Sequence, residues 1–322
     1  MEHGESFTDF FVILARDFLN ERPLPNLVCA YAGGSVGRGE ADAYSDLDLH
    51  VFVEGETDLY SENLQFRGHL IQLQVQTAPV DEEVYENPWA WRYLKEAKVV
   101  LDPKDRYIPW MNDMCAYFDS TAGKAKILAQ AKAGVDTFYE EASSALSEGF
   151  PYSAYLAAWA GWIETLQMTA FFQGHSLSDT HLYQLVHKAG RWDESKRFFQ
   201  ETYRNERALQ DALSVLADYR AHLRLVKESI SFALAPENDL LLEKKLQRLQ
   251  EREQLDMAGF LLFSDAIWLY HSVDADEWLE NHWAKLPSRL HLRLKKFGFF
   301  QADEQLISRL RHTSAELITE IS

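Results

Sequence analysis

Two chemical groupings lie close together between residues 33 and 48 of this chain. The first is Gly33-Gly34-Ser35, which directly follows the short apolar run at residues 27–32. Glycines let the main chain approach a ligand closely, and successive backbone N–H groups with a serine hydroxyl can cradle phosphate oxygens. This grouping therefore predicts a phosphate-binding turn at the end of a buried strand.

The second grouping is a pair of aspartates, Asp46 and Asp48, on either side of Leu47. Apolar residues continue at every second position as far as Val53. Strand periodicity places these apolar side chains on one face and both carboxylates on the other. Two carboxylates that point the same way suit Mg²⁺, which prefers one or two carboxylates plus substrate phosphates. We therefore expect Asp46 and Asp48 to be metal ligands with a catalytic role.

Taken together, these residues resemble a known signature. Gly33-Gly34-Ser35, then Gly37, then Ser45-Asp46-Leu47-Asp48 resemble the motif of the polymerase-β-like nucleotidyltransferase superfamily, whose small members include the aminoglycoside and lincosamide nucleotidyltransferases. The resemblance covers roughly the first third of the chain in detail. It implies an Mg²⁺-dependent enzyme that moves a nucleoside monophosphate from a nucleoside triphosphate, ATP first among the candidates, to a small hydroxylated or amino acceptor.

The motif and the resemblance together also imply individual roles. Gly34 and Ser35 would hold the β- and γ-phosphates, and Arg38 would neutralise their charge. The full set of expected nucleotide contacts is Gly33, Gly34, Ser35, Arg38, Ser45 and Gln74. An aminoglycoside-type antibiotic as the acceptor is an analogy with the small members of the superfamily.

The strand expected at residues 70–77 departs from the superfamily pattern. The resemblance implies a third carboxylate there, but the corresponding face carries Gln72, Gln74 and Gln76. A neutral amide cannot act as a general base near neutral pH and adds no charge to hold a second Mg²⁺. This departure leaves open a catalytically weak or inactive nucleotide-binding or regulatory protein.

The general base must then come from another segment. Glu82 is our first candidate for this catalytic role, and Glu83 and Glu40 are the alternatives. The fold implied by the resemblance also leaves open adenylylation of a protein or of RNA.

Composition limits the partners. The 322 residues carry a formal net charge of −18, and residues 1–121 hold 9 Lys and Arg against 22 Asp and Glu, a balance of −13. Such a field repels long nucleic acids but would attract a polycationic acceptor. No apolar run reaches the length of about 18 residues that a membrane span needs, and no export-type segment is recognised. We expect a cytoplasmic protein without a membrane partner, and a homodimer is left open.

We expect an α+β protein of two domains. Residues 1–121 would form the nucleotidyltransferase domain, a small mixed sheet that binds nucleoside triphosphate and metal, with a helix at 5–20, strands at 27–32, 46–54, 70–77 and 98–103, and a helix at 81–96 that Pro88 kinks or splits. Residues 122–322 would form an all-α bundle that lines the acceptor cleft, with helices near 124–148, 151–173, 193–233, 239–271 and 303–321. Within the 151–173 helix the aromatic stripe is expected to be core, and Glu164 is a candidate acceptor contact.

Overall fold

The computed structural model describes residues 6–55, 58–188, 206–226, 232–274 and 277–321. The chain divides into two compact units, Met1–Ile127 and Leu128–Ser322, which are described here one at a time. All five strands that the structure describes lie in the first unit, and the described part of the second unit is helical. This confirms the α+β class expected from the sequence.

The first unit is built on one five-stranded mixed sheet with the order β3-β4-β2-β1-β5. The strands are β1 (Leu27–Ala32), β2 (Leu47–Val53), β3 (Tyr60–Phe66), β4 (His69–Thr77) and β5 (Lys98–Leu101). The central strand β2 runs antiparallel to β1 and parallel to β4. The edge strand β3 was not predicted, because its sequence is mostly polar and it lies only partly buried against β4.

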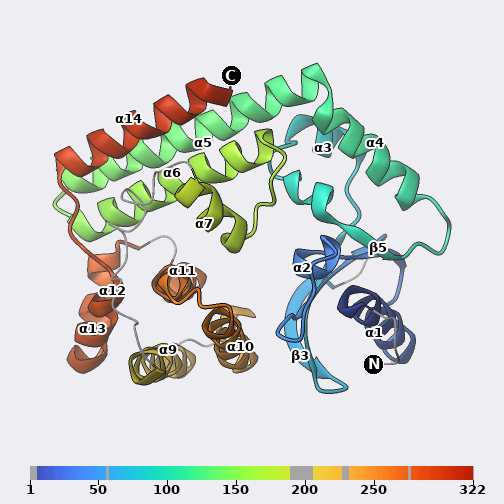
Figure 1. Cartoon of the computed structure of the whole chain (residues 1–322), viewed down its shortest axis with the longest axis horizontal. Coiled ribbons are helices and arrows are strands. Elements are labelled where there is room, and N and C mark those ends of the chain that lie inside the picture. Colours follow the sequence, from blue (N-terminus) through green and yellow to red (C-terminus); the bar gives the residue numbers. More distant parts are fainter. Residues whose placement is uncertain (1–5, 56–57, 189–205, 227–231, 275–276, 322) are drawn as a thin grey trace. The chain divides into compact units, whose positions relative to one another are not determined.

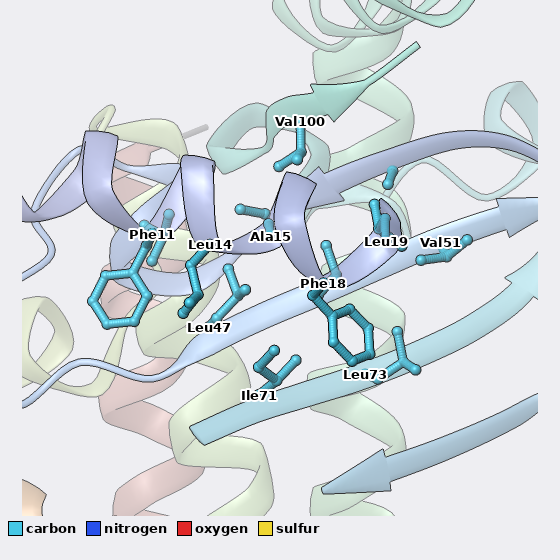
Figure 2. Close-up of a cluster of buried hydrophobic side chains, with 14 of the residues drawn as sticks. Phe11, Leu14, Ala15, Phe18, Leu19, Leu47, Val51, Ile71, Leu73 and Val100 are labelled. Carbon is cyan, nitrogen blue, oxygen red and sulfur yellow. The ribbon is translucent and has the colours of Figure 1, made fainter. Parts of the chain in front are cut away.

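One face of this sheet is covered by α1 (Phe7–Glu21). The helix begins where the Ser6 side chain accepts a hydrogen bond from the backbone N–H of Asp9. Figure 2 shows Phe11, Leu14 and Phe18 pointing from α1 toward the strands. Strand residues that meet the helix include Leu47, Val51, Ile71, Leu73 and Val100. This contact is the hydrophobic core of the first unit.

The far end of the opposite face is covered by aromatic rings. Phe52 of β2 contacts Trp91, Tyr107 and Trp110 at ring-centroid distances of 6.4, 6.0 and 6.3 Å. These rings come from the segment around α3 (Asp81–Glu86), η1 (Arg92–Glu96) and α4 (Tyr107–Asp119). The helix predicted over 81–96 is therefore split into α3 and η1, with Pro88 in the turn between them, and α4 was not predicted.

The helices of the second unit appear in green to red in Figure 1. They are α5 (Thr121–Ser147), which contains the division between the units, α6 (Pro151–Phe172), α7 (Asp179–Lys188), α9 (Glu206–Val226), α10 (Glu237–Glu251), α11 (Asp256–Asp274), α12 (Leu279–Lys285), α13 (Ser288–Leu294) and α14 (Glu304–Ile321), with short 3-10 turns η3 (Phe232–Leu234) and η4 (Lys295–Phe297). Within the helix predicted over 193–233, the described residues form α9 and the start of η3, and residues 193–205 and 227–231 lie outside the described residues.

The prediction of a single helix over 239–271 is wrong, because α10 ends at Glu251 and a separate helix, α11, begins at Asp256. Glu253 adopts a left-handed φ of 55°. The N–H of Gln254 donates to the carbonyl of Leu249, and the N–H of Glu253 donates to that of Gln250. This is the Schellman pattern that usually places glycine at the left-handed position. A glutamate there gives no sequence signal for a helix end.

Helix α6 is held in the second unit by a buried hydroxyl network. The hydroxyl of Thr165 donates to Ser314 Oγ of α14 at 2.9 Å, and Ser314 Oγ is 2.8 Å from the Tyr139 hydroxyl of α5. Figure 1 shows α6 running beside α14. The aromatic stripe of α6, which includes Trp159 and Trp162, is buried as expected. None of the helices within the described ranges is long and apolar enough to cross a bilayer.

Truncating the core contact of α1 should destabilise the first unit. Phe18 is 2% exposed, so Phe18→Ala should lower the free energy of unfolding by about 3–5 kcal/mol through lost apolar contact and a residual cavity. Ile13 lies on the same helix but is 45% exposed, so Ile13→Ala should change it by less than about 0.5 kcal/mol. Urea unfolding followed by circular dichroism measures both. Equal effects would contradict the assigned core face.

Candidate active site

The glycine turn that follows β1 is held against the start of β2. The backbone N–H of Gly33 donates to the carbonyl of Asp48 at 2.8 Å. Gly34 has a φ of +54°, and a methyl group placed on it would lie 1.9 Å from Oδ2 of Asp48. Only glycine therefore allows the turn to approach this carboxylate so closely.

The aspartates project from the face of β2 that α1 does not cover. Leu47, Leu49 and Val51 are fully buried in the core beneath α1. The alternation of side chains along a strand then places Asp48 on the opposite face, with Asp46 just before the strand in the same alternation. Asp46 is 8% exposed and Asp48 is half-buried. The structure thus brings Asp48 and the predicted glycine turn together.

The parallel pairing of β2 with β4 decides which glutamine neighbours the aspartates. Asp48 pairs with Gln72, and Gln74 pairs with the next polar residue of β2, His50. Gln74, expected to contact the nucleotide, therefore lies one polar position further along the face. Gln72 is therefore the glutamine that lies next to Asp48.

Ser35 and Ser45 are joined by hydrogen bonds inside the loop that links β1 to β2. The Ser35 hydroxyl donates to Ser45 Oγ at 3.0 Å, and the Ser45 hydroxyl donates to Asp42 Oδ1 at 3.2 Å. Ser45 Oγ also accepts from the backbone N–H of Asp42 at 2.9 Å. Ser45 is 4% exposed, and in this structure its hydroxyl holds Ser35 by accepting the hydrogen bond from the Ser35 hydroxyl. Asp42, which sequence reasoning did not single out, also accepts from the backbone N–H of Tyr44 at 2.9 Å and so holds the end of the loop that leads into β2.

Arg38 is engaged by two carboxylates. Its Nε donates to Glu40 at 2.8 Å and its Nη1 donates to Glu96 of η1 at 3.1 Å. Burial lowers the pKa of the Arg38 guanidinium, but the hydrogen bonds and charges of Glu40 and Glu96 outweigh burial and raise it overall. Arg38 is therefore a permanent cation held at the turn. Glu40, an alternative candidate for the general base, is one of the groups that hold it.

Gly37 has a packing role in the same turn. A methyl group at Gly37 would lie 2.1 Å from the carbonyl oxygen of Glu96 and 2.6 Å from that of Ala32. The helical turn α2 (Gly34–Gly37) therefore presses directly on the backbone of η1 and of β1. The third glycine of the motif is explained by this close approach of main chains.

His50 is a residue of this face that sequence reasoning missed. It continues the alternation of Asp46 and Asp48, and this was the signal that could have identified it. Its ring stacks on Tyr31 of β1 with a centroid distance of 4.7 Å and an interplanar angle of 3°. Burial lowers the pKa of His50 to about 4, so the ring is neutral near pH 7.

Glu82, the first candidate for the general base, is exposed in the first turn of α3. The strand that leads to it, β4, ends at Thr77 beside Val53. At about 3.3 Å per residue, Val53 is some 16 Å along β2 from Asp48. The strand therefore delivers the chain to α3 far along β2 from the aspartates, and the catalytic role of Glu82 stays a prediction.

The carboxylates of Asp46 and Asp48 fit Mg²⁺ better than a metal that takes all its ligands from the protein. Within the described residues, no group of three or more His, Cys, Asp or Glu side chains is arranged to hold an ion. Mg²⁺ takes one or two carboxylates and completes its shell with phosphates and water. Asp46 and Asp48 supply such carboxylates, and Asp48 Oδ2 lies against the turn where phosphates are expected.

Comparison with known families decides what this arrangement is. Residues 13–101 match the family described as "Nucleotidyltransferase domain". This segment is a nucleotidyltransferase domain. It includes β1, the glycine turn, both aspartates and β4, and it confirms the polymerase-β-like superfamily that residues 33–48 resemble. The match supports nucleotidyl transfer as the general activity of the domain.

Other comparisons add less. No curated protein matches the chain. Among solved structures, a nucleotidyltransferase-like protein from Exiguobacterium sibiricum 255-15 is similar at 13% identity and a TM-score of 0.33, covering 89% of this chain and 88% of that chain. A likeness at this level assigns no role to any residue of the nucleotidyltransferase domain.

A methyl group at Gly34 should disrupt the domain more than one at another left-handed glycine. Gly34→Ala combines strain at φ +54° with a clash against Asp48, whereas Gly39→Ala has φ +79° and no atom within 4 Å of the added methyl. We expect Gly39→Ala to cost about 1 kcal/mol and Gly34→Ala at least about 2 kcal/mol more. Urea unfolding of both variants gives the difference. Equal costs would show that Asp48 does not rest against the turn.

Proposed function

We propose that this protein is an Mg²⁺-dependent nucleotidyltransferase. It transfers a nucleoside monophosphate from a nucleoside triphosphate, with ATP as the first candidate, to a small hydroxylated or amino acceptor. The observation that carries the proposal is the contact of the Asp48 carboxylate with the Gly34 turn inside a nucleotidyltransferase domain. A triphosphate beside this turn would lie next to a carboxylate that can share its cation.

The chain's own residues divide the work of binding. Gly33 and Gly34 leave the main chain open to phosphate oxygens, and the Ser35 hydroxyl can turn from Ser45 toward them. Arg38 is held at the base of the turn by Glu40 and Glu96, and it would neutralise phosphate charge by exchanging one of these carboxylates for a phosphate oxygen. Asp46 and Asp48 would hold Mg²⁺, which when bound stabilises the charge that builds on the transferring phosphoryl group.

The acceptor is proposed by class only. A net charge of −13 over residues 1–121 favours a cationic acceptor, and an aminoglycoside-type antibiotic satisfies this condition. Glu164 of the second unit was the candidate acceptor contact. Its carboxylate would lie 3.4 Å from a methyl group placed on Gly134 of α5, so it faces a neighbouring helix. Glu82 remains our first candidate for the base that takes the acceptor proton.

A second function is favoured by one observation. Gln72 stands beside Asp48 where the superfamily pattern implies an acid. With two carboxylates in place of three, the site can bind one cation and a nucleotide but lacks the acid that would help to hold a second Mg²⁺. A nucleotide-binding or regulatory protein with weak or no transfer activity would have this site.

Removing the charge of Asp48 should abolish Mg²⁺-dependent nucleotide binding. Asp48→Asn keeps the shape of the side chain but weakens its affinity for Mg²⁺, so turnover should fall by roughly two to three orders of magnitude. Asp113→Asn makes the same change at an exposed position of α4 and should leave both quantities unchanged. Calorimetry with Mg²⁺ and a non-hydrolysable ATP analogue, together with a pyrophosphate-release assay across cationic acceptors, measures them. Normal binding by Asp48→Asn would refute the metal assignment.

Restoring the missing acid should distinguish the two functions. Gln72→Glu adds a carboxylate beside Asp48, and it should raise turnover at least about tenfold if the absent acid limits an enzyme. Gln74→Glu places the same charge beside His50 and serves as the register control. Pyrophosphate release by both variants is the measurement. Nucleotide binding without transfer in either variant would favour the binding protein, and a gain only in Gln74→Glu would move the third-acid position to Gln74.

A further inference from the structure

His50 lies next to Gly33 of the glycine turn. A methyl group placed on Gly33 would lie 3.2 Å from Nε2 of His50 and 3.7 Å from Cβ of Asp48. Gly33 has a φ of −97°, which other residues also adopt, so backbone conformation does not require glycine there. Because Gly33 has no side chain, a ligand that approaches its main chain also comes close to Nε2 of His50.

The two nitrogens of the His50 ring have different surroundings. Nδ1 is buried without a hydrogen-bond partner, whereas Nε2 is directed toward Gly33. An orphaned buried donor is rarer in proteins than an under-satisfied acceptor. The tautomer with its proton on Nε2 leaves only a lone pair on the buried Nδ1. With its proton on Nε2, the ring directs an N–H group toward the turn.

The position of this N–H group is fixed by packing. Tyr31 stacks on the ring almost in parallel and is itself 7% exposed. The Tyr31 hydroxyl is hydrogen-bonded to the side chain of Gln76 on β4, which anchors the stack across β2. A donor that is held in place loses little conformational entropy when a ligand binds.

We propose that His50 is a nucleotide-binding residue whose Nε2–H donates to a phosphate oxygen of the triphosphate held at Gly33 and Gly34. This inference rests on the proposed function and extends it to a residue outside the glycine and aspartate motif. A phosphate oxygen is a strong acceptor, and with no side chain on Gly33 it could approach this main chain and reach Nε2 of His50.

Binding measurements test the proposal. His50→Phe keeps the stack on Tyr31 but removes the donor, so affinity for α,β-methylene-ATP with Mg²⁺ should fall roughly 10- to 100-fold by calorimetry, as expected for a hydrogen bond to a charged group. His50→Gln restores a donor and should recover part of the loss. His69→Phe makes the same change against Phe10 and Phe11 of α1 and should bind as the wild type does.

Three outcomes are informative. Wild-type affinity in His50→Phe, with unchanged thermal stability, would overturn the role of His50 while leaving the proposed function intact. No nucleotide binding by the wild type would overturn both. A loss of affinity in His50→Phe that His50→Gln does not reduce at all, accompanied by a lower melting temperature, would show that His50 acts through packing and would also overturn the proposal.

The tautomer gives a readout that needs no nucleotide. Nitrogen-15 spectra of histidine-labelled protein at pH 7 should show His50 with its proton on Nε2, the signal being assigned by its loss in His50→Phe. Adding the Mg²⁺ complex of α,β-methylene-ATP should shift the Nε2 resonance more than the Nδ1 resonance. A proton on Nδ1, or shifts of equal size, would contradict the proposal.

Discussion

One face of strand β2 lies in the hydrophobic core and the other carries the candidate active site, and the site depends on this constraint. Leu47, Leu49 and Val51 are fully buried beneath α1, while the intervening Asp48 and His50 face the other way. A slip of one residue would place the acids in the hydrophobic core and the leucines at the turn. Burial of the apolar set therefore fixes the direction of the carboxylates, even though the two sets never touch.

Close approach of main chains provides the rest of the site. Gly34 lets the turn lie against Asp48, and Gly37 lets it press on the carbonyl groups of Ala32 and Glu96. The polar side chains of the turn are held by their neighbours, as Ser35 is by Ser45. A nucleotide that binds here meets groups whose positions are already set, which reduces the entropy lost on binding.

The sequence predicted the ends of helices correctly where the residue type at the end favours the backbone conformation found there. The helix predicted over 151–173 ends as expected, and the next residue, Gly174, has a φ of +71° with the same hydrogen-bond pattern that ends α10. The break at Glu253 was missed because a glutamate rarely adopts this conformation. Strand β3 was missed because an edge strand buries little apolar surface, so its pattern of polar residues resembles that of a loop.

The sequence alone determined the glycine turn, the face of β2 that carries the aspartates, and the helix that covers the other face. These follow from periodicity and spacing within single segments. Tertiary structure alone decided that Gln72 neighbours Asp48, that Arg38 is held by Glu96, and that His50 stacks beside the turn. Each of these depends on the register or packing between segments distant in the chain, and no local pattern of residues encodes such pairing.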